Sequence, residues 1–284
     1  MNPPPTDRGT PFVAPALVLL SLITLYPVLS VLALSLLHKL PLFGISRFAG
    51  LENYRFLLTD DRFWNAFRNT VYFAAVSVSL ELLLGLALAL LLNRTFPFKG
   101  IATAIVLVPW AIPTVVSARM WEWMYNTDLG ILNHLLGVKI NWLGSPFWAL
   151  NAAVFMDVWK TTPFTVILLL AGLRVIPREL LQAARIDGAG AWQLFSRITL
   201  PMLMPVILVV LIFRTLDAFR VFDAVYVLTG GGPANTTETL SVYAYKVLFQ
   251  TLQFGYGSTL SVVVFLCVGA ISVLYIRLLG RAGQ

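Results

Sequence analysis

The sequence predicts an all-α polytopic membrane protein with six transmembrane helices. Three observations support this fold class. First, 58% of the 284 residues are hydrophobic and 12% are charged, whereas about a quarter of the residues in a soluble domain are charged. Second, six apolar segments are each long enough to cross a bilayer, which takes about 20 residues. Third, most lysine and arginine residues lie between these segments.

The predicted spans follow the apolar segments in chain order. They lie near residues 12–37, 70–92, 101–124, 148–173, 201–228 and 257–279. The first is too long for the apolar core of a cleaved signal peptide, so we interpret it as a retained anchor. The proline-rich residues 1–11 before it predict a disordered N-terminus. We expect Pro109, Pro113 and Pro163 to kink the third and fourth spans and to free backbone carbonyls near a cavity.

The distribution of basic residues between the loops predicts the orientation of the chain. Nine lysines and arginines lie on the side that includes both termini and the loop 174–200, and seven lie in the longer loops of the other side. Because cytoplasmic loops carry the excess of basic residues, we expect both termini to be cytoplasmic. The opposite loop 38–69 interleaves charged with apolar residues, which is typical of a helix at the outer membrane surface.

Several kinds of chemistry are absent from the sequence. Cys267 is the single cysteine and His38 and His134 are the two histidines, so we predict neither a disulfide nor a common metal site. No P-loop occurs, so we do not expect the chain to bind ATP, and neither HExxH nor GxSxG occurs. We interpret the net charge of +7 as basic cytoplasmic loops rather than a nucleic-acid-binding surface.

The loop at residues 174–200 is polar and lies between two apolar spans. It predicts two short helices joined at Asp187-Gly188, with Pro177 at the first helical position and Gly188 in the left-handed conformation that ends a helix. Asp187 would alternatively cap the second helix. The apolar face of that second helix would consist of Trp192, Phe195 and Ile198 or Thr199. Such a face needs a cover, which is either the lipid headgroups or a partner.

Ionisable residues inside the predicted spans are a second informative feature. Each would cost about 2.5–3.5 kcal/mol if it faced lipid at mid-depth, so we expect most to face the bundle interior, water or one another. These residues are Glu81, Arg119, Glu122, Asp157, Lys160, Arg214, Asp217, Arg220 and Asp223. Counted along the helices, Asp157 and Lys160 of the fourth span lie at the level of Arg214 and Asp217 of the fifth, about 20–24 Å above the inner face.

Two interpretations of these charges stay open, structural pairs between helices and direct contacts to a ligand. We favour a pair of Asp157 with Lys160 within one helix turn, and ligand contacts at Asp217 and Phe222. Around the fifth helix, the charges from Arg214 to Asp223 wind halfway round, so we expect that they do not all line one cavity. Nearby aromatic residues suit a sugar, although aromatic residues also fill membrane cores. The candidate pathway residues are Asp157, Lys160, Arg214, Asp217, Phe219, Phe222, Asp223 and Tyr226.

The loop 174–200 resembles the EAA loop of the permease subunits of binding-protein-dependent ABC importers. The residues that fall on this motif are Ala183, Ala184, Asp187, Gly188, Ala189, Ile198, Leu200 and Pro201. Gln182 stands where the family has glutamate, and we expect Glu179, one turn earlier, to supply the acid. The resemblance implies a cytoplasmic coupling helix that docks into a partner ATPase. The residues so implied are Glu179, Gln182, Ala183, Ala184, Asp187, Gly188, Ala189 and Phe195.

Two further regions extend the resemblance. FAGLENY at 48–54 with Asn69-Thr70 resembles the outside loop of this permease family where it enters its next span. FRTLDAFRVFDAVYVLTGGGP at 213–233 resembles the fifth-span region of the maltose- and trehalose-type sugar permeases, in particular the first permease subunit of the trehalose importers. The resemblance implies the type I ABC importer permease fold, with residues 12–284 as a single transmembrane permease domain that includes the EAA-like coupling loop.

The function implied by this resemblance is sugar import across the cell inner membrane, with a disaccharide such as trehalose or maltose as the substrate. The implied partners are a second homologous permease subunit, two cytoplasmic ATPases that use ATP and magnesium, an extracytoplasmic sugar-binding protein, the sugar and membrane lipid, with no nucleic acid. The chain itself would bind no cofactor and catalyse no reaction. The alternatives are a permease for another solute such as glycerol phosphate, a secondary transporter, and a membrane-embedded enzyme.

Overall fold

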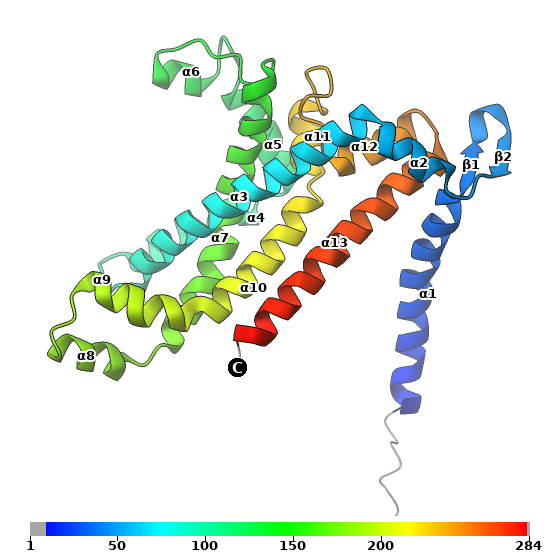
Figure 1. Cartoon of the computed structure of the whole chain (residues 1–284). Helices are drawn as coiled ribbons and strands as arrows, with labels where there is room; N and C mark the ends of the chain where they lie inside the picture. The colour runs from blue at the N-terminus through cyan, green and yellow to red at the C-terminus, as the bar shows by residue number, and fades with distance from the viewer. Residues whose placement is uncertain (1–9, 283–284) are drawn as a thin grey trace, which may run out of the picture. The chain divides into compact units, whose positions relative to one another are not determined.

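A computed structural model describes residues 10–282, so the predicted disordered N-terminus lies outside the described residues except for Thr10 and Pro11, which begin the first helix. Within this range, five helices are long and apolar enough to cross a membrane, and a bent helix pair is a sixth candidate. The predicted all-α polytopic fold is confirmed, with the addition of one two-stranded hairpin. The described chain comprises two compact units. Figure 1 shows the chain with a colour that runs from blue at the N-terminus to red at the C-terminus.

The first unit holds the chain up to Asp60 together with Ala244–Phe265. Its elements are α1 (Thr10–Ser35), β1 (Leu37–Leu40), a 3-10 turn (Pro41–Phe43), β2 (Ile45–Phe48), α2 (Glu52–Thr59), a π-helical turn (Lys246–Gln250) and the first part of α13 (Phe254–Ala282). β1 and β2 run antiparallel, with Leu37 opposite Phe48. The predicted surface helix in the loop 38–69 is present as α2, but the sequence did not reveal the hairpin before it.

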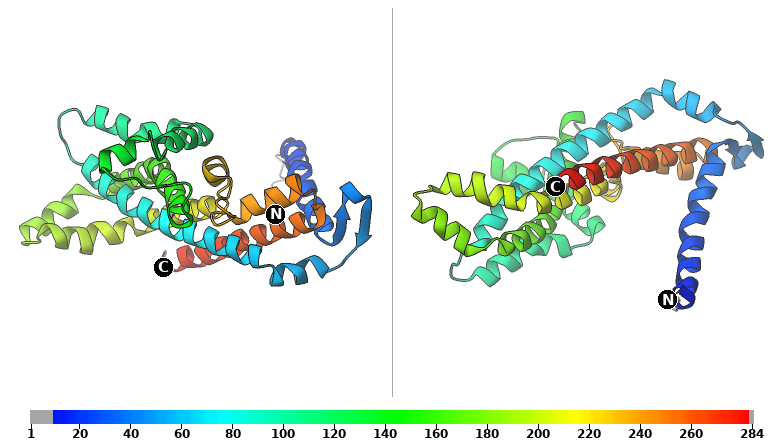
Figure 2. Two further views of the ribbon diagram at one scale, coloured as in Figure 1. Left: turned by 90° about the horizontal axis from the view of Figure 1, so that it is seen from above. Right: turned by 60° about the horizontal axis from the view of Figure 1, so that its bottom comes forward.

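The second unit holds Asp61–Tyr243 and the chain from Leu266 onward. Its helices are α3 (Asp61–Asn93), α4 (Lys99–Ala111), α5 (Thr114–Met124), α6 (Ile131–Leu136), α7 (Pro146–Val175), α8 (Arg178–Ile186), α9 (Ala191–Leu194), α10 (Leu200–Phe219) and α11 (Asp223–Thr229), with most of α12 (Leu240–Tyr245) and the last part of α13. α7 packs against α3, α4 and α10. Within this unit, α8 and α9 lie at one end, and α6 and α11 at the other (Figures 1 and 2).

The crossing of α3 and α7 is tight because a glycine lies there. A Cβ atom on Gly85 would come within 2.4 Å of the Cγ2 atom of Thr165. α3 begins at Asp61, nine residues before the predicted start of its span at residue 70. Pro163, where we expected a kink, lies inside one continuous helix. Because α3 and α7 approach closely at Gly85, these two long helices form a closely packed frame for the residues between them.

Two predicted spans are interrupted. The third, 101–124, divides into α4 and α5, which meet at an angle of 98°. The break falls at Pro113, which has no N–H group to continue the helical hydrogen-bond ladder. The fifth, 201–228, leaves the helix at Arg220, and α11 follows as a separate short helix. Each break leaves backbone groups without an intrahelical partner.

Candidate functional site

The loop between α7 and α10 turns at a left-handed glycine. Asp187 is the C-cap of α8, and Gly188 follows with φ of +85°. The N–H of Gly188 donates to the carbonyl of Arg185 (3.1 Å), and the N–H of Ala189 donates to the carbonyl of Ala184 (2.9 Å). These two bonds are those of a Schellman motif, which satisfies carbonyls at a helix end. The predicted turn and the conformation of Gly188 are confirmed.

Two details of the predicted loop are wrong. Pro177 is the residue before α8 and is extended, with ψ of 130°, so α8 begins one residue later than expected. Asp187 belongs to the end of α8 and does not cap the next helix. That helix starts after Gly190, whose N–H donates to Oε1 of Gln193 at 2.9 Å. A glycine at the cap has no side chain to accept a hydrogen bond, so Gln193 closes the turn instead.

The second helix of the loop is the beginning of the fifth span rather than a separate short helix. α9 continues through a π-helical turn at Phe195–Thr199 into α10, which gives one helix of 29 residues over Ala191–Phe219. Trp192 at its free end is 74% exposed, and Ile186 of α8 is 87% exposed. Among the predicted coupling residues, the exposed ones are Glu179, Gln182, Ala183, Asp187 and Gly188, and the half-buried ones are Ala184, Ala189 and Phe195.

A second group of predicted residues meets at Arg214, inside the second unit. Its guanidinium contacts both carboxylate oxygens of Glu81, with Nη2 2.9 Å from Oε1. Nη1 donates to Asp217 Oδ2 at 2.6 Å, and Nη2 lies 3.3 Å from Asp157 Oδ2. The Thr161 hydroxyl also donates to Glu81, at 2.8 Å. One cation on α10 thus holds three carboxylates, which come from α3, α7 and α10 itself.

This cluster corrects the expected pairing within α7. Asp157 pairs with Arg214, whereas no carboxylate of the described residues lies within 4.0 Å of the Lys160 ammonium. A guanidinium offers five donors in a fixed plane, so it can satisfy several acids at once. Asp157, which we expected to pair with Lys160, therefore pairs with Arg214. The central position of Glu81 was missed. Counting from the predicted end of its span near residue 92 would have placed it close to the level of Lys160.

The charge cluster borders a cavity of about 240 Å³. Both helix breaks reach it, with Trp110 and Thr114 on one side and Val221 and Phe222 on the other. Its charged lining consists of Asp157, Lys160, Arg214, Asp217, Arg220 and Asp223. The expectation that the charges from 214 to 223 would not share one cavity is wrong. α10 ends before Arg220, so the regular rotation of side chains around the helix stops there.

The predicted aromatic residues divide between two sides of α10. Phe222 borders the cavity and stacks on Tyr226, with ring centroids 5.0 Å apart and ring planes 14° apart. Phe219 is buried and borders a different hollow, together with Thr215 and Tyr275. Phe222 therefore has direct access to the charged cavity, Tyr226 supports its ring, and Phe219 faces elsewhere.

Comparison with known proteins relates this architecture to a family. Residues 81–282 match the family described as binding-protein-dependent transport system inner membrane component. The chain is 44% identical over 273 residues to the trehalose/maltose transport system permease protein MalF of Thermococcus litoralis, covering 95% of this chain and 92% of that protein. It is also 44% identical over 271 residues to the trehalose transport system permease protein SugA of Mycobacterium tuberculosis, covering 95% and 88%.

A solved structure has the same fold. In the crystal structure of a bacterial ABC transporter involved in the import of the acidic polysaccharide alginate, one chain matches with a TM-score of 0.84, over 98% of each chain and at 23% sequence identity. The family match covers most of this chain, and the sequence likeness to curated permeases covers nearly all of it. The chain therefore belongs to the family of inner membrane components of binding-protein-dependent transport systems.

Proposed function

We propose that this chain is a permease subunit of an ATP-driven importer, which moves a disaccharide of the trehalose or maltose type from an extracytoplasmic binding protein to the cytoplasm. The observation that carries the proposal is the cavity in which two interrupted helices meet a ring of charged side chains. Interrupted helices leave backbone N–H and C=O groups available, and transporters use such breaks to bind polar substrates within the membrane. The likeness to two permeases named for trehalose supports the choice of sugar.

The cavity lining suits a neutral, polyhydroxylated ligand. The Asp217 side chain is 62% exposed and offers carboxylate oxygens to sugar hydroxyls. Lys160 offers ammonium donors from the opposite helix, and Phe222 offers a ring for the C–H face of the sugar. Because the lining contains acids and bases side by side, a neutral ligand leaves its charge balance unchanged. In this proposal Glu81 and Arg214 hold the three helices together and orient the groups that touch sugar.

Coupling to ATP enters through the loop between α7 and α10. The exposed side chains of Ile186 and Trp192 on either side of the Gly188 turn give an apolar face that a cytoplasmic ATPase would cover. ATP and magnesium bind to that partner, and this chain catalyses no reaction. Two such ATPases and a second homologous permease subunit complete the importer, with both termini of this chain in the cytoplasm. Glu179 then supplies the acid that the motif has at the position of Gln182.

Uptake of radiolabelled solutes in a strain that lacks the chromosomal copy tests the proposal. We expect labelled trehalose or maltose to accumulate when the chain is restored with its partners, and accumulation to stop when the ATPase subunit carries a substitution in its P-loop lysine. Accumulation of glycerol phosphate in place of a disaccharide would show that the substrate is wrong. Uptake that survives the ATPase substitution but collapses with a protonophore would identify a secondary transporter instead.

A further inference from the structure

One end of α1 is fixed to a polar structure at the membrane boundary. The apolar stretch Val13–Ser35 has 23 residues and is about 34 Å long, slightly more than the hydrocarbon core of about 30 Å. Ser35 therefore lies where the hydrocarbon ends. The amide of Asn53 donates to the carbonyls of Ser35 and Leu37 at 2.8 and 3.0 Å, so α2 is tied to the end of the span. Side chains at this junction lie at the level of the lipid headgroups.

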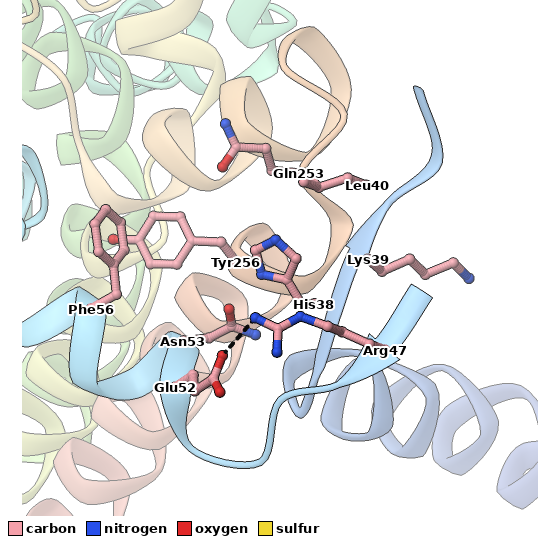
Figure 3. Close-up of a pocket in the computed structure, with 9 residues that line it drawn as sticks. All are labelled: His38, Lys39, Leu40, Arg47, Glu52, Asn53, Phe56, Gln253 and Tyr256. Carbon is pink, nitrogen blue, oxygen red and sulfur yellow. Dashed lines mark hydrogen bonds and ion pairs between the residues drawn. The ribbon is translucent and has the colours of Figure 1, made fainter. Parts of the chain in front are cut away.

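A cavity of about 290 Å³ opens at this junction, between the hairpin, α2 and the start of α13. His38 and Arg47 are direct partners across the two strands. Figure 3 shows both side chains turned towards the other labelled residues, whereas the side chain of Lys39 points away. Arg47 contacts Glu52 at 3.1 Å, and both side chains are 60% exposed. Within residues 10–282, the half-buried imidazole of His38 has no hydrogen-bond partner.

The wall opposite the hairpin is aromatic and rigid. The ring of Tyr256 meets Phe56 edge to face at 5.0 Å, and its hydroxyl donates to Asp60 at 2.5 Å. Gly255 lets α13 approach β1 closely, since a Cβ atom there would lie 2.0 Å from the carbonyl oxygen of Leu37. Packing and hydrogen bonds therefore fix the shape of the cavity.

The geometry points to a binding site for the headgroup of a zwitterionic phospholipid, with its phosphate on Arg47 and His38 and its ammonium on Glu52. A guanidinium matches phosphate oxygens with two parallel donors, and an imidazole adds a further donor. The carboxylate of Glu52 repels a purely anionic ligand, but it suits the ammonium of a phosphoethanolamine headgroup. A ligand that carries both charges at headgroup spacing is therefore favoured over an anionic lipid.

The tip of the hairpin supports a lipid rather than a free phosphate ion. Leu42 is 70% exposed and Phe43 is 71% exposed, on the 3-10 turn that joins the strands. We place these side chains among the headgroups at the membrane boundary, where large aromatic residues contact lipid. In this proposal the tip contacts the lipid whose headgroup the cavity holds. With the orientation given under the proposed function, this lipid lies in the extracytoplasmic leaflet. The site itself rests only on α1 as a membrane span.

Competition between lipids tests the site. The full-length permease, purified with its partner subunits, is reconstituted in vesicles of equal parts phosphatidylethanolamine and phosphatidylglycerol, re-extracted, and analysed for retained lipid by mass spectrometry. We expect phosphatidylethanolamine to be enriched in the wild type. Arg47→Gln should lower its retention about three- to tenfold, the range for one hydrogen bond. Arg55→Gln is the matched control, since it removes an exposed cation from α2 outside the cavity.

A second variant keeps the test informative if Arg47→Gln does not fold. Glu52→Gln should retain as much total phospholipid as the wild type but lose the preference for phosphatidylethanolamine. Equal retention of both lipids by the wild type would overturn the proposal. So would displacement of the lipid by millimolar inorganic phosphate, which would indicate an ion site. If Arg47→Gln leaves lipid retention unchanged but weakens stimulation by the binding protein, the cavity is a protein-docking site and the inference is wrong. Failure here would leave sugar uptake intact, so it is separable from failure of the proposed function.

Discussion

Replacing Glu81 with glutamine is expected to destabilise the protein far more than replacing Asp217 with asparagine. Each change neutralises one carboxylate that contacts Arg214 and preserves the size of the side chain. Glu81 makes two contacts to the guanidinium and its side chain is fully buried, whereas the side chain of Asp217 is 62% exposed. The two variants therefore compare the same chemistry at two levels of burial.

The expected magnitudes follow from this burial. Removing one partner of a buried ion pair costs about 3–5 kcal/mol, because the remaining charge stays uncompensated. Arg214 keeps two other acids, so we expect the lower end, about 3 kcal/mol, for Glu81→Gln. The side chain of Arg214 is 5% exposed but that of Asp217 is 62% exposed, so solvent screens this pair and we expect Asp217→Asn to cost about 1 kcal/mol, the upper end for an exposed pair. In a chain of this size, these values correspond to falls in the melting midpoint on the order of 10 °C and about 2 °C.

Thermal unfolding of the detergent-solubilised protein, followed by tryptophan fluorescence, measures these midpoints. A third comparison gives the sharper test. In an Arg214→Gln background the acids have lost their cation, so Glu81→Gln should raise the midpoint instead of lowering it, by relieving a buried charge. Equal falls for Glu81→Gln and Asp217→Asn would refute the reasoning. So would a Glu81→Gln effect that is the same with and without Arg214, since that would mean that the two side chains are not coupled.

Three further predictions concern single positions. Gly188→Val should reduce co-purification of the tagged ATPase, because the φ of +85° at this position costs a β-branched residue about 1–2 kcal/mol. The control is Gly190→Ala, which should not reduce it, since Gly190 has a φ of −71° and lies in equally open space. Glu179→Gln should lower sugar uptake and sugar-stimulated ATP hydrolysis, and wild-type transport by this variant would show that the acid is dispensable. Gly85→Ala should lower the melting midpoint, because overpacking costs about 1–3 kcal/mol of stability. Adding Thr165→Ala to this variant should restore the midpoint, and a midpoint that stays low would mean that the clash lies elsewhere.

Local sequence signals predicted the long helices and the coupling turn well. Span length follows from runs of apolar residues, and the left-handed turn follows from one residue, Gly188, that tolerates positive φ. The hairpin was missed because its strands have only four residues each. Strands this short carry little period-two signal, and their pairing is stabilised by contacts such as that between Gly255 and Leu37, which are distant in sequence.

The level of the charged side chains along their helices was predictable from the sequence, but the direction in which they point was not. Residue counting placed the charges of α7 and α10 at one level, because helix rise is constant. Rotation about the helix axis depends on packing, and uniformly apolar spans do not reveal it. The break at Pro113 has a local cause in the missing N–H group. The break at Arg220 has neither proline nor glycine beside it, so its position depends on tertiary contacts, and with it the surroundings of Asp223.

The continuous helix from Ala191 to Phe219 has a mechanical consequence. Trp192 lies at its free end and Arg214 lies in the charge cluster, about 33 Å apart along the helix axis. If this helix tilts by about 5° about its end at Trp192, the backbone at Arg214 moves by about 3 Å. The contact of Arg214 to Asp157, which lies on α7, is 3.3 Å long, and a displacement of that size would break it, whereas Asp217 lies on α10 and would move with Arg214. A movement of the helix end at Trp192 would therefore be transmitted along the helix to the contact between Arg214 and Asp157.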